Sequence, residues 1–241
     1  MSFGYQVLGF GTSTAAGGPT VEYIGGYSAG DASAGSGVQT AVATKTGDIV
    51  IFMGGNVNAP SGNFAQGMTG PTVSLIGPAW VSIYKVYLFG GIRRVASDGE
   101  AYPTHTGLQT GQYGVVHLRP SDPDIAILGT DAFGGGSAGG TSAVTPTVTI
   151  NAANDSTANV KAYIVFGTSL TFNKAGTRSV SQTMDKFGTF RSAGNCDINF
   201  GVVCYEKEDA LNLTFSGGYS TNRDQNEAGY TPAFGFLIKL G

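Results

Sequence analysis

Charged residues are scarce in this chain of 241 residues. Asp, Glu, Lys and Arg together make up 12% of it, about half of the share that is usual in a globular protein. The formal net charge is −3, and the 13 Lys and Arg residues are scattered, with Arg93 and Arg94 as the nearest approach to a cluster. Because nucleic-acid binding draws most of its affinity from clustered cations on phosphates, we expect no nucleic-acid partner.

Histidine, the commonest general acid or base and metal ligand, occurs only twice. His117 alternates with Val116 and Leu118 in a strand-like run and is expected to be a hydrogen-bonded structural residue, whereas His105 lies in the loop YPTHTG. Neither has a cysteine or carboxylate at ligand spacing, which predicts no transition-metal site. The glycine-rich run 134–140 lacks the Lys-Ser/Thr ending of a phosphate loop, and there is no Gly-x-Ser-x-Gly elbow. We expect no catalytic residues, no cofactor and no enzymatic activity.

Two small groups of carboxylates are candidate ion sites. Asp122 and Asp124 in SDPD are split by a proline and are typical of a turn, and Glu206, Glu208 and Asp209 in YEKEDA are typical of a solvated edge or a short helix. Either group is alternatively a surface Ca²⁺ site, since Ca²⁺ prefers clustered oxygen ligands. A glycoside hydrolase would need two close carboxylates, and no motif marks such a pair.

Cysteine is equally rare, with only Cys196 and Cys204 in the chain. The extended segment between them would span roughly 26 Å, whereas a disulfide needs α-carbons within about 7 Å. A bridge would require a tight hairpin at Gly201, so we expect buried thiols without a disulfide, which favours a reducing cytoplasm. No apolar run approaches the ~20 residues of a membrane helix, and the N-terminus is unlike a signal peptide. We therefore expect synthesis in the cytoplasm and no membrane partner.

Glycine, with 39 residues, and small polar residues replace the missing charge. They are poor helix formers, whereas the Thr, Val, Ile, Tyr and Phe of the chain suit strands. The run 49–53 is apolar on both faces, which predicts a central strand that follows a turn at 45–48. The hydrophobic run 233–240 predicts a strand inside a sheet. Further strands are expected at 38–44, 72–77, 80–89 (opened by Trp80), 92–96 before a turn at 97–99, 115–118 (ended by Pro120), 169–172, 178–183, 198–205 and 212–216, with a glycine-rich linker at 131–143 and no helix longer than a turn or two at 206–211.

Residues 1–37 are expected to form an extended N-terminal arm and a Gly/Ser/Ala-rich spacer before a β-sandwich over 38–241. Residues 1–11 alternate like a strand and then change parity, so they are either a first strand of the sandwich or an arm that docks on another subunit. The flexible composition of 12–20 favours the arm. The residues of this candidate assembly interface are Phe3, Tyr5, Val7, Leu8 and Phe10.

The order of elements in 38–55 recurs in 144–167: an alternating strand, a polar turn, an apolar strand and a glycine. Two similar halves, 38–130 and 144–241, would produce this recurrence. The local pattern that any sandwich repeats would produce it equally well.

Tyrosines in glycine-rich segments are the feature best suited to sugar binding. GGYS occurs twice, and Gly-Tyr recurs at 229–230 near the Asn-containing stretch STNRDQNE. Loops that offer Tyr, Ser, Asn and Gly are adhesive in antibodies. The candidate glycan contacts are Tyr27, Tyr219 and Tyr230, with ordinary turns as the alternative interpretation.

The stretches TGDIVIFMGG, GPAWVSIYKVY, RRVASDGEAYPT, GVVHLRP and TPTVTI…VKAYIVFG follow one another along most of the chain. This series resembles a family of jelly-roll structural proteins encoded by bacteriophages. The opening MSFGYQVLGFG is similar to the start of many small proteins of tailed phages, particularly marine ones. The resemblance implies an all-β, jelly-roll-like antiparallel β-sandwich, a place in the virion and no catalytic residues.

The expected function is therefore that of a bacteriophage virion structural protein assembled in the host cytoplasm. Capsid decoration or cement (head auxiliary) protein is the first expectation, with the major capsid protein or neighbouring subunits as partners. The alternative is a tail fibre or receptor-binding adaptor, which would contact tail components and host surface glycans. Homo-oligomers, trimers among them, are expected by analogy with other jelly-roll virion proteins.

Overall fold

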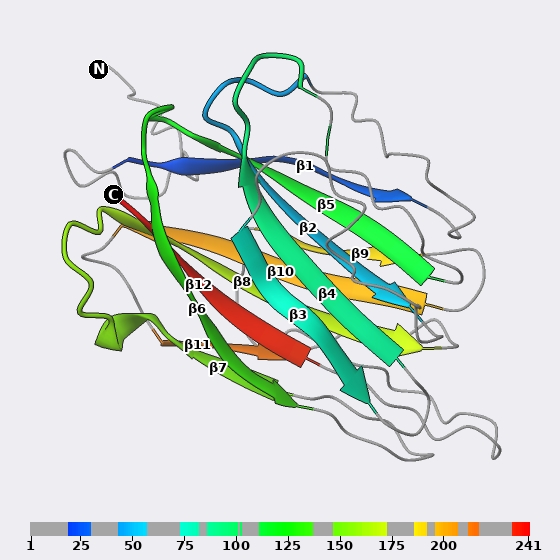
Figure 1. Cartoon of the computed structure of the whole chain (residues 1–241). Coiled ribbons are helices and arrows are strands. Elements are labelled where there is room, and N and C mark those ends of the chain that lie inside the picture. Colours follow the sequence, from blue (N-terminus) through cyan, green and yellow to red (C-terminus); the bar gives the residue numbers. More distant parts are fainter. Residues whose placement is uncertain are drawn as a thin grey trace, which may run out of the picture.

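The structure is a computed structural model, and it describes residues 19–29, 43–56, 73–81, 86–100, 102, 111–136, 147–172, 186–191, 196–206, 212–216 and 233–241. Nearly all regular structure in these ranges is β-strand, and the one helix among them is a 3₁₀ turn, Ala152–Asn154. The strands form two five-stranded sheets and one two-stranded sheet, and all pairs are antiparallel (Figure 1). The expected all-β class is confirmed.

The first half of the chain builds the first sheet, in the spatial order β1-β5-β2-β4-β3. Its strands are β1 (Val21–Ala29), β2 (Ile49–Asn56), β3 (Val73–Val81), β4 (Val86–Arg94) and β5 (Gly111–Pro120). Strand β2 lies in the middle, and each residue from Ile49 to Phe52 is at most 1% exposed. The prediction of a central strand covered on both faces is confirmed, as are the turns at 45–48 and 97–99.

The second half builds the second sheet, in the order β6-β12-β8-β10-β9. Its strands are β6 (Ile127–Gly136), β8 (Ala162–Phe172), β9 (Lys186–Arg191), β10 (Cys196–Glu206) and β12 (Ala233–Leu240). Strand β12 has a neighbour on each side, as its apolar sequence predicts.

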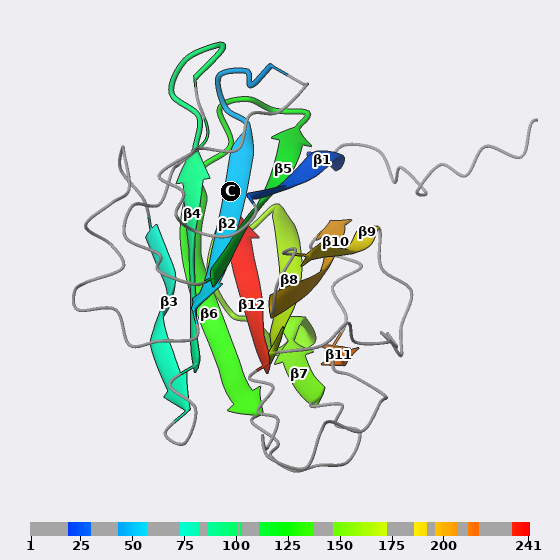
Figure 2. The ribbon, with the colours of Figure 1, turned by 90° about the vertical axis from the view of Figure 1, so that its right-hand side faces the viewer.

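The two sheets pack face to face, with β1 beside β9 along one border and β3 beside β6 along the other (Figure 2). Alternate residues of each sheet meet in one core. From the first sheet these include Ile51, Ile92 and Val116, and from the second Ile164 and Ile238, all fully buried. Burying one such side chain contributes about 1.5–3 kcal/mol, so this inter-sheet core holds the sandwich together.

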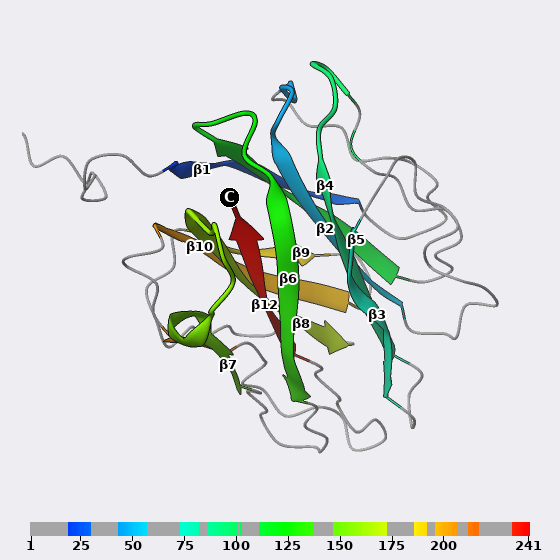
Figure 3. The same ribbon diagram turned by 60° about the vertical axis from the view of Figure 1, so that its left-hand side comes forward.

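A third layer covers the outer face of the second sheet. It consists of β7 (Thr147–Asn151) and β11 (Asn212–Ser216), which pair with each other. Strand β7 contacts β12 and β6 (Figure 3). Strand β11 contacts β8. Val148 and Ile150 of β7 join Tyr163, Val165 and Leu237 in a second buried cluster.

Two glycine-rich segments that the sequence assigned to a spacer and a linker carry strands. Residues 21–29 form β1, so the sandwich begins before residue 38, and β6 runs through 131–136 of the expected linker. Each of these strands lies at an edge of its sheet and pairs along its length with a more apolar strand, β5 or β12. Backbone pairing to an established partner outweighs the weak strand preference of glycine.

Two strand boundaries were also misplaced. Trp80 lies near the end of β3 and pairs with Tyr87 of β4, so 80–89 is not one strand. Residues 169–172 continue β8 beyond Gly167, which pairs with Gly201 of β10 and does not end the strand. The predictions for 1–18, 38–42, 178–183 and 207–211 lie outside the described residues.

Candidate functional site: two buried aspartate clusters

Asp48 ends the turn that leads into β2 and lies on the outer face of the first sheet, only 1% exposed. Strand β5 alternates, so Leu118 enters the core while His117 and Arg119 project to the outer face. Arg119 Nε donates to Asp48 Oδ1 and Nη2 donates to Oδ2, both at 2.8 Å. The Lys45 backbone N–H donates to Oδ2 as well, also at 2.8 Å. Two strands and a turn therefore converge on one buried carboxylate.

His117 connects this carboxylate to Tyr102. Its Nε2 lies 2.7 Å from Asp48 Oδ2, and its Nδ1 lies 2.8 Å from the Tyr102 hydroxyl. Since an ionised carboxylate only accepts hydrogen bonds, Nε2 carries the proton and donates, and Nδ1 of the neutral ring accepts from the tyrosine. Asp48, Tyr102, His117 and Arg119 are called the Asp48 cluster below. The expectation that His117 is a hydrogen-bonded structural residue agrees with this geometry.

The ionisation states follow from burial and from these bonds. Burial lowers the pKa of His117 below its ordinary value, although Asp48 acts in the opposite direction. Burial would raise the pKa of Asp48, but the hydrogen bonds from Arg119, Lys45 and His117 outweigh it and the pKa is lowered. At neutral pH the His117 imidazole is thus neutral, and the negative charge of the Asp48 carboxylate cancels the positive charge of the Arg119 guanidinium.

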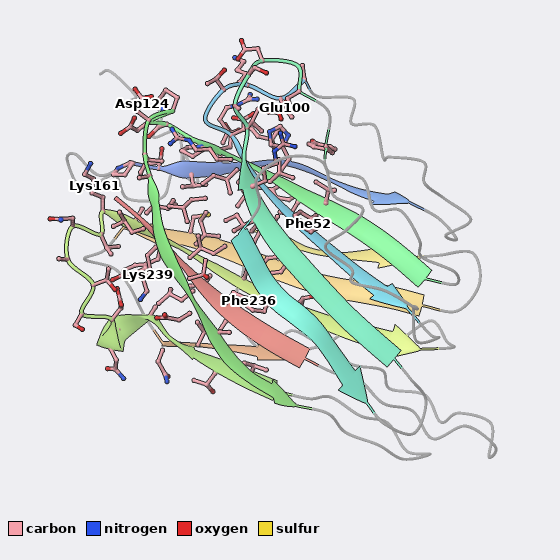
Figure 4. All side chains as sticks on the ribbon, in the orientation of Figure 1. Phe52, Glu100, Asp124, Lys161, Phe236 and Lys239 are labelled. Atoms are coloured by element: carbon pink, nitrogen blue, oxygen red, sulfur yellow. The ribbon has the colours of Figure 1, made fainter. Side chains whose placement is uncertain are left out.

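The neighbouring turns are tied together around this cluster. Thr44 Oγ1 donates to the Glu100 carbonyl at 2.7 Å, and the Gly99 N–H donates to the Thr44 carbonyl at 2.8 Å. Glu100, labelled in Figure 4, forms an ion pair with Arg93 of β4 and accepts from the backbone N–H of Ala96. The connections before β2 and after β4 are therefore joined at one end of the sandwich.

A second cluster lies on the outer face of the second sheet, around Lys239 of β12. Lys239, labelled in Figure 4, has its Nζ 2.7 Å from Asp131 Oδ2 and 2.8 Å from Asp155 Oδ1, distances that the figure does not mark. Tyr163 OH donates to Asp155 Oδ2 at 2.8 Å, and Thr157 Oγ1 donates to Asp155 Oδ1 at 2.8 Å. These five residues, called the Asp155 cluster below, tie the segment after the 3₁₀ turn to strands β6, β8 and β12.

Charge pairing dominates the Asp155 cluster. Burial would raise the pKa of Asp155, but bonds from Lys239, Thr157 and Tyr163 lower it to about 2. Burial and the bond to Asp155 raise the pKa of Tyr163 to about 12. Burial would lower the pKa of Lys239, but the two aspartates raise it. All three groups keep their ordinary charge states over the whole neutral range.

Both clusters predict that acid weakens the fold. The folded-state pKa of His117 lies below its ordinary 6.5, so its contribution to stability is complete above pH 6.5 and is lost as pH falls through the folded-state pKa. The contribution of Asp155 is complete above its ordinary pKa of 3.8 and is lost as pH falls toward about 2. At about 1.4 kcal/mol per pKa unit, this contribution amounts to roughly 2 kcal/mol at most.

Urea midpoints measured from pH 8 to pH 2 should therefore fall in two stages. Asp155→Asn should shrink the lower stage, to which the lowered pKa of Asp48 also contributes, and keep the upper one. A parent midpoint that is constant from pH 4 to pH 2 would contradict the prediction.

The chemistry of the Asp48 cluster is limited by burial. A histidine held by an aspartate is also the base of many hydrolytic sites. Here the His117 side chain is 0% exposed, and its accepting nitrogen is occupied by Tyr102. In this arrangement the pair holds turns on a sheet and does not receive a proton from a bound molecule.

Few of the site residues predicted from the sequence lie among the residues that the structure describes. Tyr27 lies in β1, opposite Val115 of β5. Asp122 Oδ1 accepts from the Asp124 N–H at 2.9 Å, as expected of a turn. Within the part of the chain that the structure describes, no group of His, Cys, Asp and Glu is placed to hold a metal ion. Outside the described residues lie Phe3, Tyr5, Val7, Leu8, Phe10, His105, Glu208, Asp209, Tyr219 and Tyr230.

The two cysteines both belong to β10, which excludes the hairpin that a bridge between them would need. Gly201 lies in the middle of this strand, paired with Gly167 on one side and Phe187 on the other. Cys204 is a thiol outside any disulfide and is half-buried against the core, less buried than expected.

Sequence reasoning singled out none of the acidic residues at the centres of these clusters. A signal existed for one member: Lys239 is the single charge in the apolar run AFGFLIKL, and such a charge requires a buried partner. Asp48 follows Gly47 immediately before an apolar strand, which is also the pattern of an ordinary turn.

No family model matches the chain, and neither the curated proteins nor the solved structures contain a match to it. Among the described residues, no helix has the length and apolar character needed to cross a membrane.

Proposed function

We propose that this chain is a structural protein of a bacteriophage particle, and specifically a capsid decoration or cement protein that binds the major capsid protein or neighbouring subunits. The sequence resemblance to phage-encoded virion proteins suggests the particle. The observation that carries the proposal is the use of the described ionisable groups at the centres of the two clusters. The side chains of Asp48 and Asp155 are only 2% and 5% exposed, and both are charge-paired and fix turns on sheets. A rigid two-sheet body of this kind suits a component that must keep its shape between neighbours.

The jelly-roll part of the proposal is the least supported by the topology. A jelly roll combines two sheets from two Greek keys, and the chain does form two facing antiparallel sheets. Each sheet here comes from one half of the chain, without exchange of strands between the halves. The proposal of a virion role therefore depends on the rigid sandwich and not on a particular strand order.

The copy number of the chain in purified particles of the phage that encodes it tests the function. Quantitative mass spectrometry should find it at the scale of the shell's own subunits. A copy number on the scale of one tail ring or fibre set would replace the decoration role by the tail-fibre or receptor-binding alternative, in which Tyr27, Tyr219 and Tyr230 contact host glycans. Absence from the particle would overturn both.

Deletion of residues 1–11 is expected to leave a folded protein that no longer joins particles. The described sandwich begins with β1 at Val21, and the segment before it holds the candidate interface residues Phe3, Tyr5, Val7, Leu8 and Phe10. Circular dichroism should show an unchanged melting curve, while co-sedimentation with particles that lack the protein should be lost. If the truncated protein unfolds, the segment is a strand of the sandwich and the arm is disproved.

A further inference from the structure

We infer that the chain is a tandem duplication of one five-stranded unit, and that the two copies, residues 19–120 and 127–241, pack on each other as a homodimer would around a twofold axis. The inference concerns the fold and does not depend on the proposed function. It moves the boundaries of the two halves suggested by the sequence, and it identifies which residues correspond.

The strand orders of the two sheets are the same. Replacing β1, β2, β3, β4 and β5 by β6, β8, β9, β10 and β12 converts the order β1-β5-β2-β4-β3 into β6-β12-β8-β10-β9. The two remaining strands, β7 and β11, lie in the connections before β8 and before β12 and belong to neither five-stranded sheet. One connection also has the same length in both units, because four residues separate β3 from β4 and four separate β9 from β10.

The residue register agrees as well as the order. In the first sheet Ile51 of the central strand pairs with Val116, and in the second Ile164 pairs with Ile238. One step along, Val50 pairs with His117, and Tyr163 pairs with Lys239. An offset by one residue would send inward side chains outward, but Ile51, Ile164, Val116 and Ile238 all belong to the inter-sheet core.

This register makes the two aspartate clusters counterparts. His117 and Lys239 occupy corresponding positions on β5 and β12, and each contacts a buried aspartate supplied by the connection that precedes the central strand. The turn just before each central strand contains a residue with positive φ, Gly47 at 88° and Asn159 at 63°. Two unrelated halves would have no reason to place a polar cluster at the same point of the same strand pair.

The packing of the sheets has the matching symmetry. The central strands β2 and β8 point the same way (Figure 1). Because all pairs are antiparallel and the strand orders match, the other corresponding strands also run in the same direction, so a twofold axis between the sheets runs along the strands. Such an axis must place β1 beside the counterpart of β3, and β3 beside the counterpart of β1. The neighbours observed are β1 with β9 and β3 with β6, as this rule demands (Figure 2). A contact in which both partners use the same surface is the isologous contact of a C2 dimer.

The duplication is not evident in the sequence because the two units share strand order and register but not residue types. Across the central strands the register aligns Val50 with Tyr163 and Phe52 with Val165. All four side chains are buried on the outer faces, but their sizes differ.

Circular permutation tests the inference, because a twofold pair has two equivalent connections and only one is closed in the natural chain. The closed connection places eight residues, 119–126, between Leu118 and Ile127; the corresponding open one lies between Leu240 and Tyr23. Gly241 and residues 19–22 supply five of the eight, so a linker of three residues reproduces the natural spacing. The short permutant therefore runs from Asp124 to Gly241, through three added residues, and from Pro19 to Pro123. A long permutant opened at the same bond keeps residues 1–18 as its linker, and natural-order residues 19–241 serve as the parent of the short one.

We expect both permutants to be monomeric, to unfold cooperatively and to melt within about 4 °C of the natural order. A long permutant that folds while the short one does not would show that the two connections are not equivalent, and would overturn the inference. Failure of both would contradict it equally, since complete symmetric units do not depend on which of the two connections is closed.

Discussion

Asp48→Asn is expected to lower the free energy of unfolding by about 3 kcal/mol, the low end of the usual cost of removing one partner from a buried ion pair, because the Arg119 side chain is 26% exposed. The asparagine fits the space of the aspartate but carries no charge, and its amide group would face donors where the carboxylate accepted. The amide oxygen can replace only one of the two carboxylate oxygens, so the amide nitrogen opposes Arg119 Nε at the Oδ1 position, or Arg119 Nη2 and His117 Nε2 at the Oδ2 position. A stable domain has only about 5–15 kcal/mol in total, so this single change should remove a substantial share of the stability.

Asp98→Asn is the matched control, because it makes the same chemical change in a neighbouring turn. Asp98 also accepts two hydrogen bonds, from the N–H and hydroxyl of Thr46, but it is exposed. The amide oxygen of the asparagine can still accept both bonds there, and water solvates its amide nitrogen, so the loss should be much smaller. Urea denaturation of both variants measures the difference. If Asp48→Asn and Asp98→Asn unfold at the same urea concentration, the Asp48 cluster does not stabilise the fold.

The sequence predicted those strands whose burial is written into a continuous apolar run. Ile49–Phe52 and residues 233–240 were placed correctly in the interior of sheets because no other location buries apolar residues on both faces. Strand β6 was missed because its glycines carry no such signal: what fixes it is β12, about a hundred residues further along the chain. The position of an edge strand depends on the strand with which it pairs, and that strand can lie far away in the sequence.

The two aspartate clusters could not be predicted from the sequence for the same reason, because their members lie far apart in the chain. Asp48 and His117 are 69 positions apart, and Thr157 and Lys239 are 82 apart. The alternation of β5 correctly placed His117 in a strand with a structural role, but it could not name the aspartate. Spacing within a segment predicts which face a residue occupies, whereas a charge partner from another segment follows only from the sheet register.

Duplication and the clusters together explain how so weakly charged a chain keeps its end turns in place. Each unit has one buried aspartate in the connection before its central strand, and the donors come from the neighbouring strand. In the first unit the aspartate binds histidine and arginine, and in the second it binds lysine. The strand position has been kept, at His117 and Lys239, while its side chain has changed from a neutral histidine beside Arg119 to a lysine. This is expected when the constraint is a paired buried carboxylate and not a particular reaction.

Gly47→Ala is expected to cost about 2–4 kcal/mol, the sum of a positive-φ penalty near 1 kcal/mol and the strain of overpacking. Gly47 has φ of 88°, and a Cβ at this position would lie 2.3 Å from the carbonyl oxygen of Pro123 and 2.7 Å from its Cα. These are backbone atoms that cannot rotate away, and the same carbonyl accepts from the guanidinium of Arg94.

Gly99→Ala separates the two causes, because Gly99 also has positive φ, at 75°, but a Cβ there would meet nothing within 4 Å. Thermal and urea unfolding should therefore show a loss of only about 1 kcal/mol for Gly99→Ala. Equal losses at the two glycines would mean that the turn before β2 moves away from Pro123 without resistance, and that the end of the sandwich is less rigid than its hydrogen bonds imply.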